Sequence, residues 1–306
     1  MRTIVLNETN ITPDGQNNKL VYRFPNSVQF KNNYVAVQSI TMFYSWYNIS
    51  AALGNNLFQY SFTTAGGGTT FYNVNIPDGL YDITTLNQYL QFTMLANGTY
   101  MTTADGKSNV FFLTLKINPT LYAVEVCSYA VPTAASNPNG YLLPSGSTLP
   151  YPTASFTPIP VFPATFNAIV GFPAGWAGQN WVGQATSAGL YNSVPYSWNA
   201  TTGVVGYTSS ASPQVNPNAT IYLALSAINN PYSLPSSIIY AITPSNGIGG
   251  VIIDKPPQFC WNKFIDGTYN QLYVTFLGSD LSPIQIQDPN ISILLAIKDG
   301  DEYGGK

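Results

Sequence analysis

Few residues in this chain could carry chemistry, and histidine is absent altogether. Without histidine the chain cannot build the Ser-His-Asp or Cys-His systems that activate a nucleophile, and it lacks the commonest ligand of zinc and copper. Its two cysteines, Cys127 and Cys260, are far apart in sequence and make no disulfide framework. We expect both to be small buried hydrophobic residues in a reducing compartment.

Acid–base catalysis would therefore depend on carboxylates, but most aspartates stand in turn sequences. Five aspartates precede a glycine, and Asp288 precedes a proline. Glu125 differs, because strand alternation places it on the same face as Cys127. A glycosidase needs two facing carboxylates, and no partner for Glu125 is visible, so an edge-strand charge or a pair with a basic residue such as Lys116 is the simpler prediction. A carbohydrate-active β-sandwich enzyme stays open as the weakest alternative.

Aromatic clusters are the remaining candidates for binding. Trp176, Trp181 and Trp198 lie in a segment rich in proline and glycine. Indole rings could stack on sugars, but tryptophan and tyrosine are also enriched at protein interfaces. We predict a small core or an interface first and a glycan contact second. No phosphate loop, dinucleotide fingerprint or EF-hand spacing is found, so we expect no catalytic residue, cofactor or metal.

The charge distribution limits the possible partners. Only 8% of residues are charged, against roughly a quarter in an average domain, and residues 126–253 hold no Lys, Arg, Asp or Glu. The ten basic residues are scattered and the net charge is −3, which argues against nucleic acid. No apolar run is long enough to span a membrane, and no signal peptide is found. Such a neutral surface suits a protein packed against other proteins.

The elements that would position these residues are mostly strands. Apolar, β-branched and aromatic runs alternate with turn residues through the first 131 residues and again after residue 218. Most links are too short for the helical crossovers that parallel strands need. The pattern predicts an all-β fold with antiparallel sheets and at least eight strands.

One helix is expected among the strands. Asp82 is a suitable N-cap, Leu86, Leu90 and Met94 share one helical stripe with Tyr89 and Phe92, and Asn97-Gly98 provides a left-handed stop. We predict a helix of about three turns that covers an open end or one face of a β-sandwich.

Residues 132–217 differ in composition, since they hold 12 of the 23 prolines and no charge. Their aromatic content argues against disorder. We predict two domains: a β-domain of residues 1–131 and 218–306, and a loop-rich β insertion domain of residues 132–217, with 166–175 as its firmest element.

Four stretches resemble one protein family: residues 22–50, 76–91 ("IPDGLYDITTLNQYLQ"), 118–126 and 261–297. They are similar to the penton (minor capsid) proteins of virophages of the mavirus type and of Polinton-like DNA viruses. The resemblance implies a single jelly-roll β-sandwich with a short capping helix and an inserted domain. It also implies pentamers at the five-fold vertices of an icosahedral shell, with no active site.

The implied partners are four further copies of the chain and a major capsid protein with a double jelly roll. The implied location is the virion, with assembly in the host-cell cytoplasm. The alternative function is a lectin-like attachment module that binds a host-surface glycan or receptor through the insertion domain.

Overall fold

The computed structural model describes residues 1–13, 19–63, 68–147, 149–172, 204–208, 212–215, 220–244, 246–247, 249–288 and 290–300. These residues form two compact units, each with its own hydrophobic core. The jelly-roll unit comprises residues 1–47 and 216–306, and the inserted unit comprises residues 48–215. No helix among the described residues is long and apolar enough to span a membrane.

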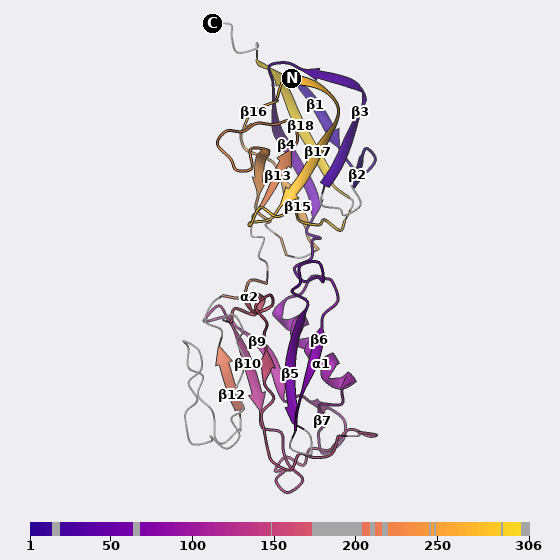
Figure 1. Ribbon diagram of the computed structural model, residues 1–306, viewed down its shortest axis with the longest axis vertical. Coiled ribbons are helices and arrows are strands. Elements are labelled where there is room, and N and C mark those ends of the chain that lie inside the picture. Colours follow the sequence, from indigo (N-terminus) through magenta and orange to yellow (C-terminus); the bar gives the residue numbers. More distant parts are fainter. Residues whose placement is uncertain are drawn as a thin grey trace. The chain divides into compact units, whose positions relative to one another are not determined.

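The jelly-roll unit contains two sheets of five strands, with the order β1-β18-β4-β15 plus β16 beside β4 in one sheet and β14-β13-β17-β3-β2 in the other (Figure 1). All of these pairings are antiparallel. The strands are β1 (Arg2–Leu6), β2 (Ile11–Pro13), β3 (Lys19–Phe30), β4 (Asn33–Phe43), β13 (Ile221–Leu225), β14 (Ile238–Ile242), β15 (Val251–Asp254), β16 (Asn262–Lys263), β17 (Gly267–Leu277) and β18 (Ser292–Asp299).

The strand order identifies the fold of this unit. Without the short strands β2 and β16, the remaining strands can be numbered from first to eighth along the chain. One sheet then has the order first, eighth, third, sixth, and the other has the order second, seventh, fourth, fifth. This order is that of a jelly roll. The predicted all-β class with a single jelly roll is confirmed, and the inserted unit lies between the third and fourth strands.

The two sheets enclose one core because their strands alternate apolar and polar side chains. In β18, Ile293, Leu295 and Ile297 point inward and are buried. Phe30 at the end of β3 stacks on Phe264 with ring centroids 4.1 Å apart and an interplanar angle of 1°. Aromatic pairs of this kind contribute energy beyond their buried area, so this stack is one of the contacts that hold the core together.

The inserted unit combines small sheets with helices. Its sheets have the orders β11-β5-β6, β12-β10-β9 and β7-β8, and every pairing is antiparallel. The elements are β5 (Leu57–Thr63), β6 (Thr69–Asn75), α1 (Ile83–Ala96), β7 (Met101–Thr102), β8 (Asn109–Val110), β9 (Leu113–Asn118), β10 (Ala123–Tyr129), β11 (Pro160–Val161), α2 (Asn167–Val170) and β12 (Val204–Thr208).

Helix α1 begins and ends where the sequence predicts. Asp82 accepts a hydrogen bond from the Thr85 amide at 2.7 Å, and the Thr85 hydroxyl accepts one from the Asp82 amide at 2.8 Å, which completes a capping box. Leu86 and Met94 are buried, but Phe92 is 61% exposed and does not belong to the buried stripe.

The predicted position of the helix differs from the observed one. Helix α1 packs within the inserted unit, where Asn87 Oδ1 accepts a hydrogen bond from the Leu115 amide of β9 at 2.8 Å. Its buried stripe belongs to the core of the inserted unit, and the jelly-roll core is a separate cluster enclosed by its own two sheets.

The division of the chain also differs from the predicted one. Residues 48–131 were expected in the jelly-roll domain, whereas they fold with residues 132–215 in the inserted unit. Among the described residues, the strands of residues 48–131 pair within that unit, with β11 added to β5 and β12 added to β10. The inserted unit is therefore about twice as long as the composition change at residue 132 indicates.

Candidate functional site

The outward face of the sheet β1-β18-β4-β15 carries no charged side chain over its middle. Cross-strand rows join Thr3 to Ala296 and Ala36, and Val5 to Leu294 and Ser39. We call this surface the neutral face, and define it by the outward positions Thr3, Val5, Ala36, Ser39, Thr41, Phe43, Val251, Ile253, Leu294 and Ala296.

Two apolar side chains of the neutral face are exposed. Val5 on the edge strand β1 is 42% exposed, and Ile253 on the opposite edge strand β15 is 63% exposed. Between them, Ala36 and Ala296 are fully buried and Ser39 is 8% exposed, so the middle of this face is shielded from solvent and its exposed apolar side chains lie at the two edges. Depletion of charge around exposed apolar residues is the compositional mark of an interface core.

The outward face of the other sheet is chemically different. We call it the charged face and define it by Thr12, Lys19, Val21, Arg23, Tyr222, Ala241, Gln271, Tyr273 and Thr275. The Lys19 ammonium lies 3.9 Å from the centroid of the Tyr273 ring. Arg23 is exposed and lies opposite Gln271. Side chains of this type suit a solvated surface.

A loop between β13 and β14 presents two further apolar side chains. Tyr232 is 95% exposed and Leu234 is 86% exposed. Asn230 orders this loop, because its amide donates to the Ser236 carbonyl at 2.7 Å and its side chain accepts from the Tyr232 amide at 3.1 Å. An aromatic side chain on an ordered loop loses little entropy on binding, which favours a contact role.

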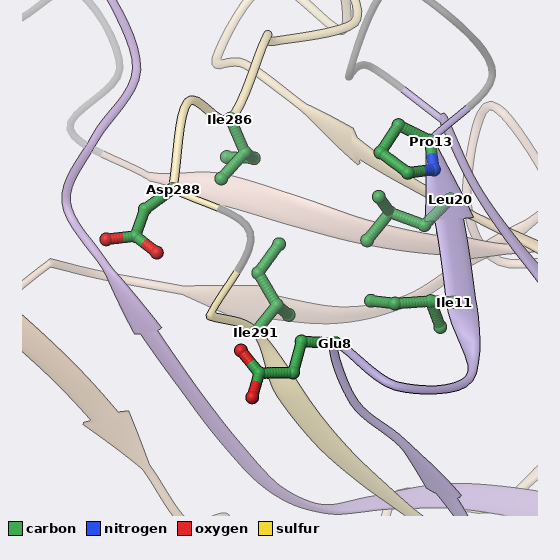
Figure 2. A pocket seen from close by; sticks show the side chains of 7 residues that line it. All are labelled: Glu8, Ile11, Pro13, Leu20, Ile286, Asp288 and Ile291. Atoms are coloured by element: carbon green, nitrogen blue, oxygen red, sulfur yellow. The ribbon is translucent and has the colours of Figure 1, made fainter.

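A small pocket lies at the end of the jelly roll where β1 ends and β18 begins. Its volume is about 90 Å³, and it is lined by Glu8, Ile11, Pro13, Leu20, Ile286, Asp288 and Ile291 (Figure 2). Clefts that bind substrates usually exceed about 300 Å³, so this one cannot hold a sugar chain between its two acids. Asp288 is a turn residue, as predicted, since its Oδ1 accepts from the Asn290 amide at 2.7 Å.

Glu125 has no acidic partner in its hydrogen bonding. It lies opposite Lys116 on β9, and its Oε1 accepts a hydrogen bond from the Asn118 side chain at 2.7 Å. Neighbouring Cys127 is buried, and burial raises the pKa of its thiol, which keeps it protonated and unreactive. No group of three or more His, Cys, Asp or Glu within the described ranges could hold a metal ion.

The remaining predicted residues divide into two groups. Cys260 is exposed, so the expectation that both cysteines are buried is wrong for this residue. It lies between Phe259 and Trp261 in the link after β15, where the Lys298 ammonium is 4.4 Å from the Trp261 ring centroid. Trp176, Trp181 and Trp198 lie outside the described residues, so their interface or glycan role stays a prediction.

Sequence reasoning did not identify the neutral face, the exposed loop or the pocket. The charge-free run of residues 126–253 does include Tyr232, Leu234 and Ile253, but most of the neutral face comes from β1, β4 and β18, outside that run. The charge-free run could therefore have indicated the exposed loop, whereas the neutral face could be identified only once the strand order was known.

Comparisons with known proteins give matches in structure only. No protein-family model and no curated protein sequence matches the chain. The structure is similar to that of the mavirus penton protein, with a TM-score of 0.44, 11% identity, and coverage of 97% of this chain and 99% of that one. It is also similar to a chain of the Sputnik virophage, with a TM-score of 0.38, 11% identity and 99% coverage of both chains.

Proposed function

We propose that this protein is a structural capsid protein, a penton that forms pentamers at the five-fold vertices of an icosahedral viral shell. Its location is then the virion, after assembly in the host-cell cytoplasm. The resemblance of residues 22–50, 76–91, 118–126 and 261–297 to virophage penton proteins supports this function. Jelly rolls also occur in lectins and cupins, so the fold does not by itself select the function.

The observation that carries the proposal is the neutral face. Val5 and Ile253 expose apolar surface at the two edges of this face, and exposed apolar surface is costly to leave in water. Its lack of charge fits burial against another protein, because an unpaired charge in an interface core costs several kcal/mol. The proposed occupant is a second copy of this chain.

Ring closure requires a heterologous interface, in which one surface of a subunit contacts a different surface of its neighbour. The neutral face is the first of these surfaces in our proposal. The five-fold position further requires contacts with the surrounding shell, which the resemblance assigns to a double-jelly-roll major capsid protein. The proposed activity is assembly, with no catalytic step.

The direct test is the oligomeric state of the recombinant full-length chain. Light scattering after size exclusion should give the mass of five 33.2 kDa subunits, and negative-stain images should show five-fold rings. A chain that remains monomeric at the highest accessible concentration would contradict the proposal. Co-assembly with the double-jelly-roll capsid protein then distinguishes a vertex position from another minor capsid role.

A further inference from the structure

Strand β6 is an edge of the sheet β11-β5-β6, so one side of its backbone has no neighbouring strand. The Ile76 amide, just after β6, donates to the Asn56 carbonyl, just before β5, at 2.8 Å. Because backbone groups alternate in direction along an antiparallel strand, every second residue of β6 before Ile76 bonds to β5. The residues between them direct their amides and carbonyls away from β5: Thr69, Phe71, Asn73 and Asn75.

Two hydrogen bonds agree with this alternation. The Ser61 amide, opposite Phe71 on β5, donates to the Ile159 carbonyl at 2.8 Å and so faces away from β6. The Asn75 carbonyl accepts a hydrogen bond from the Tyr89 hydroxyl of α1 at 2.7 Å. The outward backbone groups of the other three residues take part in no hydrogen bond among the described residues. We call residues 69–73 the free edge.

The free edge lacks the features that keep edge strands from pairing. Edge strands are usually protected by a charged side chain or a proline. Several other edge strands of this chain have one: Arg2 on β1, Pro13 on β2, Lys116 on β9 and Pro160 on β11. Strand β6 has no charge, proline or glycine, and its Phe71 is 53% exposed. An edge of this kind is a template for another strand.

We propose that the free edge pairs with the free edge of a second copy of this chain. In antiparallel pairing about a two-fold axis, Phe71 lies opposite its own copy and Thr69 lies opposite Asn73. Every outward amide and carbonyl of both free edges then has a partner. The two exposed Phe71 rings lie on the same face and form a cross-strand aromatic pair. No like charges meet, because β6 carries none.

The match of the edge with itself favours a second copy over a different protein. A two-fold contact needs a surface that is complementary to itself, and the free edge is so in hydrogen bonding, apolar character and charge. Apolar surface continues beyond it, because Phe92 is 61% exposed and its ring centroid lies 5.8 Å from that of Tyr89. A ring of five has no two-fold axis, so the contact joins two different oligomers and does not depend on the proposed ring.

The test follows amide hydrogen exchange by NMR in the ¹⁵N-labelled full-length protein over a dilution series. At high concentration, exchange of the Thr69, Phe71 and Asn73 amides should slow by about tenfold or more, because the second copy accepts their hydrogens. The amides of Tyr72 and Val74, which already bond to β5, should be unchanged. Alternation along one strand is specific to strand pairing, and protection at Tyr72 and Val74 shows that β6 stays folded on β5.

Variants of the edge separate backbone pairing from side-chain effects. Asn73→Pro removes one outward amide, at an edge position that accommodates proline, and should abolish both the concentration-dependent protection and the larger species in sedimentation velocity. Asn73→Ala is the matched control: it loses the same side chain, which accepts from Gln59 Nε2 at 2.7 Å, but keeps the amide and should retain the contact. Phe71→Lys sets like charges opposite each other and should weaken the contact by about tenfold.

Other outcomes overturn the proposal. Fast exchange of the three outward amides at every concentration would leave the edge unpaired. Slow exchange that persists at the lowest concentration and in Phe71→Lys would mean that the chain covers its own edge. An unlabelled peptide of residues 69–75 should protect the same amides. Equal protection by a scrambled peptide would show that the edge accepts any strand, and self-recognition would be refuted.

Failure of this proposal differs from failure of the penton proposal. Without the edge contact, sedimentation velocity should show a single ring at all concentrations, and Asn73→Pro should have no effect. Without the ring, the edge contact should give a dimer of 33.2 kDa subunits that Asn73→Pro converts to monomers.

Discussion

The two sheets of the jelly-roll unit are alike on the inside and different on the outside. Each has five strands, and together they bury one continuous set of aliphatic and aromatic side chains. Outward, one sheet presents the charge-free neutral face, and the other presents Lys19, Arg23 and Gln271. Inward positions of both sheets fill the same core, so their side chains are similar in kind. Outward positions depend on what lies beyond the sheet, and their difference is the reason that we propose the neutral face, rather than the charged face, as the first contact surface of the assembly.

The largest effect on stability should come from a substitution in the core that the two sheets share. Phe264 is buried and stacks on Phe30, so we expect Phe264→Ala to lower the free energy of unfolding by about 3–5 kcal/mol. Hydrogen exchange measured by mass spectrometry should then show both sheets losing protection together. The control is Phe166→Ala, which empties a buried position of the inserted unit instead. Loss of protection in one jelly-roll sheet alone would contradict a single shared core.

The next largest effect should distinguish the two outward faces. Ile253→Asp places a carboxylate on the exposed edge strand of the neutral face, and it should weaken self-association by more than about tenfold, since burying an unpaired charge costs more than 1.4 kcal/mol. Sedimentation velocity over a dilution series measures this change.

The matched variant is Ala241→Asp, because Ala241 is also exposed on an edge strand but belongs to the charged face. It should leave self-association unchanged. If Ala241→Asp disrupts the oligomer and Ile253→Asp does not, the assignment of the covered face is reversed.

A smaller effect concerns the edge at which the two sheets meet. The Tyr240 hydroxyl on β14 donates to Asp254 Oδ1 on β15 at 3.0 Å. Burial, and then the bond to the Asp254 carboxylate, raises the pKa of Tyr240 to about 12. A tyrosine in the unfolded chain ionises near pH 10. The folded pKa is the higher one, so this contribution to stability is complete below about pH 10 and is lost as the pH rises toward 12.

Urea unfolding midpoints measured across that range should therefore fall more steeply for the native sequence than for Tyr240→Phe, which has no ionisable hydroxyl at this position. Parallel curves for the two proteins would show that the bond between the sheets contributes nothing that depends on pH.

The smallest effect should come from the exposed ion pair beside the neutral face. Arg2 and Asp299 approach to 3.4 Å, with side chains that are 76% and 47% exposed. Pairs of this kind contribute about 0–1 kcal/mol, so Arg2→Gln should change thermal stability only slightly and leave the oligomeric state intact. Dissociation of the oligomer by this variant would extend the covered surface to the edge of β1.

Several features could be predicted from local sequence because local contacts produce them. The Asp82 cap, the Thr85 capping box and the left-handed Gly98 all depend on neighbours within a few residues. Asp288 forms its turn with Asn290 for the same reason. The antiparallel all-β class follows from short links between apolar runs, and it is confirmed.

Local sequence signals mislead where distant partners decide the outcome. Asp266-Gly267 resembles a hairpin turn, but β16 pairs with β4 and β17 pairs with β3, so the chain changes sheets there. Asp266 instead accepts a hydrogen bond from the Asn32 amide at 2.9 Å. Residues 283–287 alternate apolar and polar side chains like a strand, but they form only isolated bridges, from Pro283 to Leu277 and from Ile286 to Trp46.

The sequence by itself determined the kind of protein: antiparallel strands, one capped helix, turn aspartates and too little charge for a solitary surface. Each of these properties depends on residues that are close together in the chain or on composition, so the sequence alone predicts them. Only the tertiary structure decided that the inserted unit begins at residue 48, which outward face lacks charge, and that Glu8 and Asp288 meet at one pocket. Those properties depend on which strands pair across more than two hundred residues, and pairing is set by the fit of the whole core rather than by any local signal.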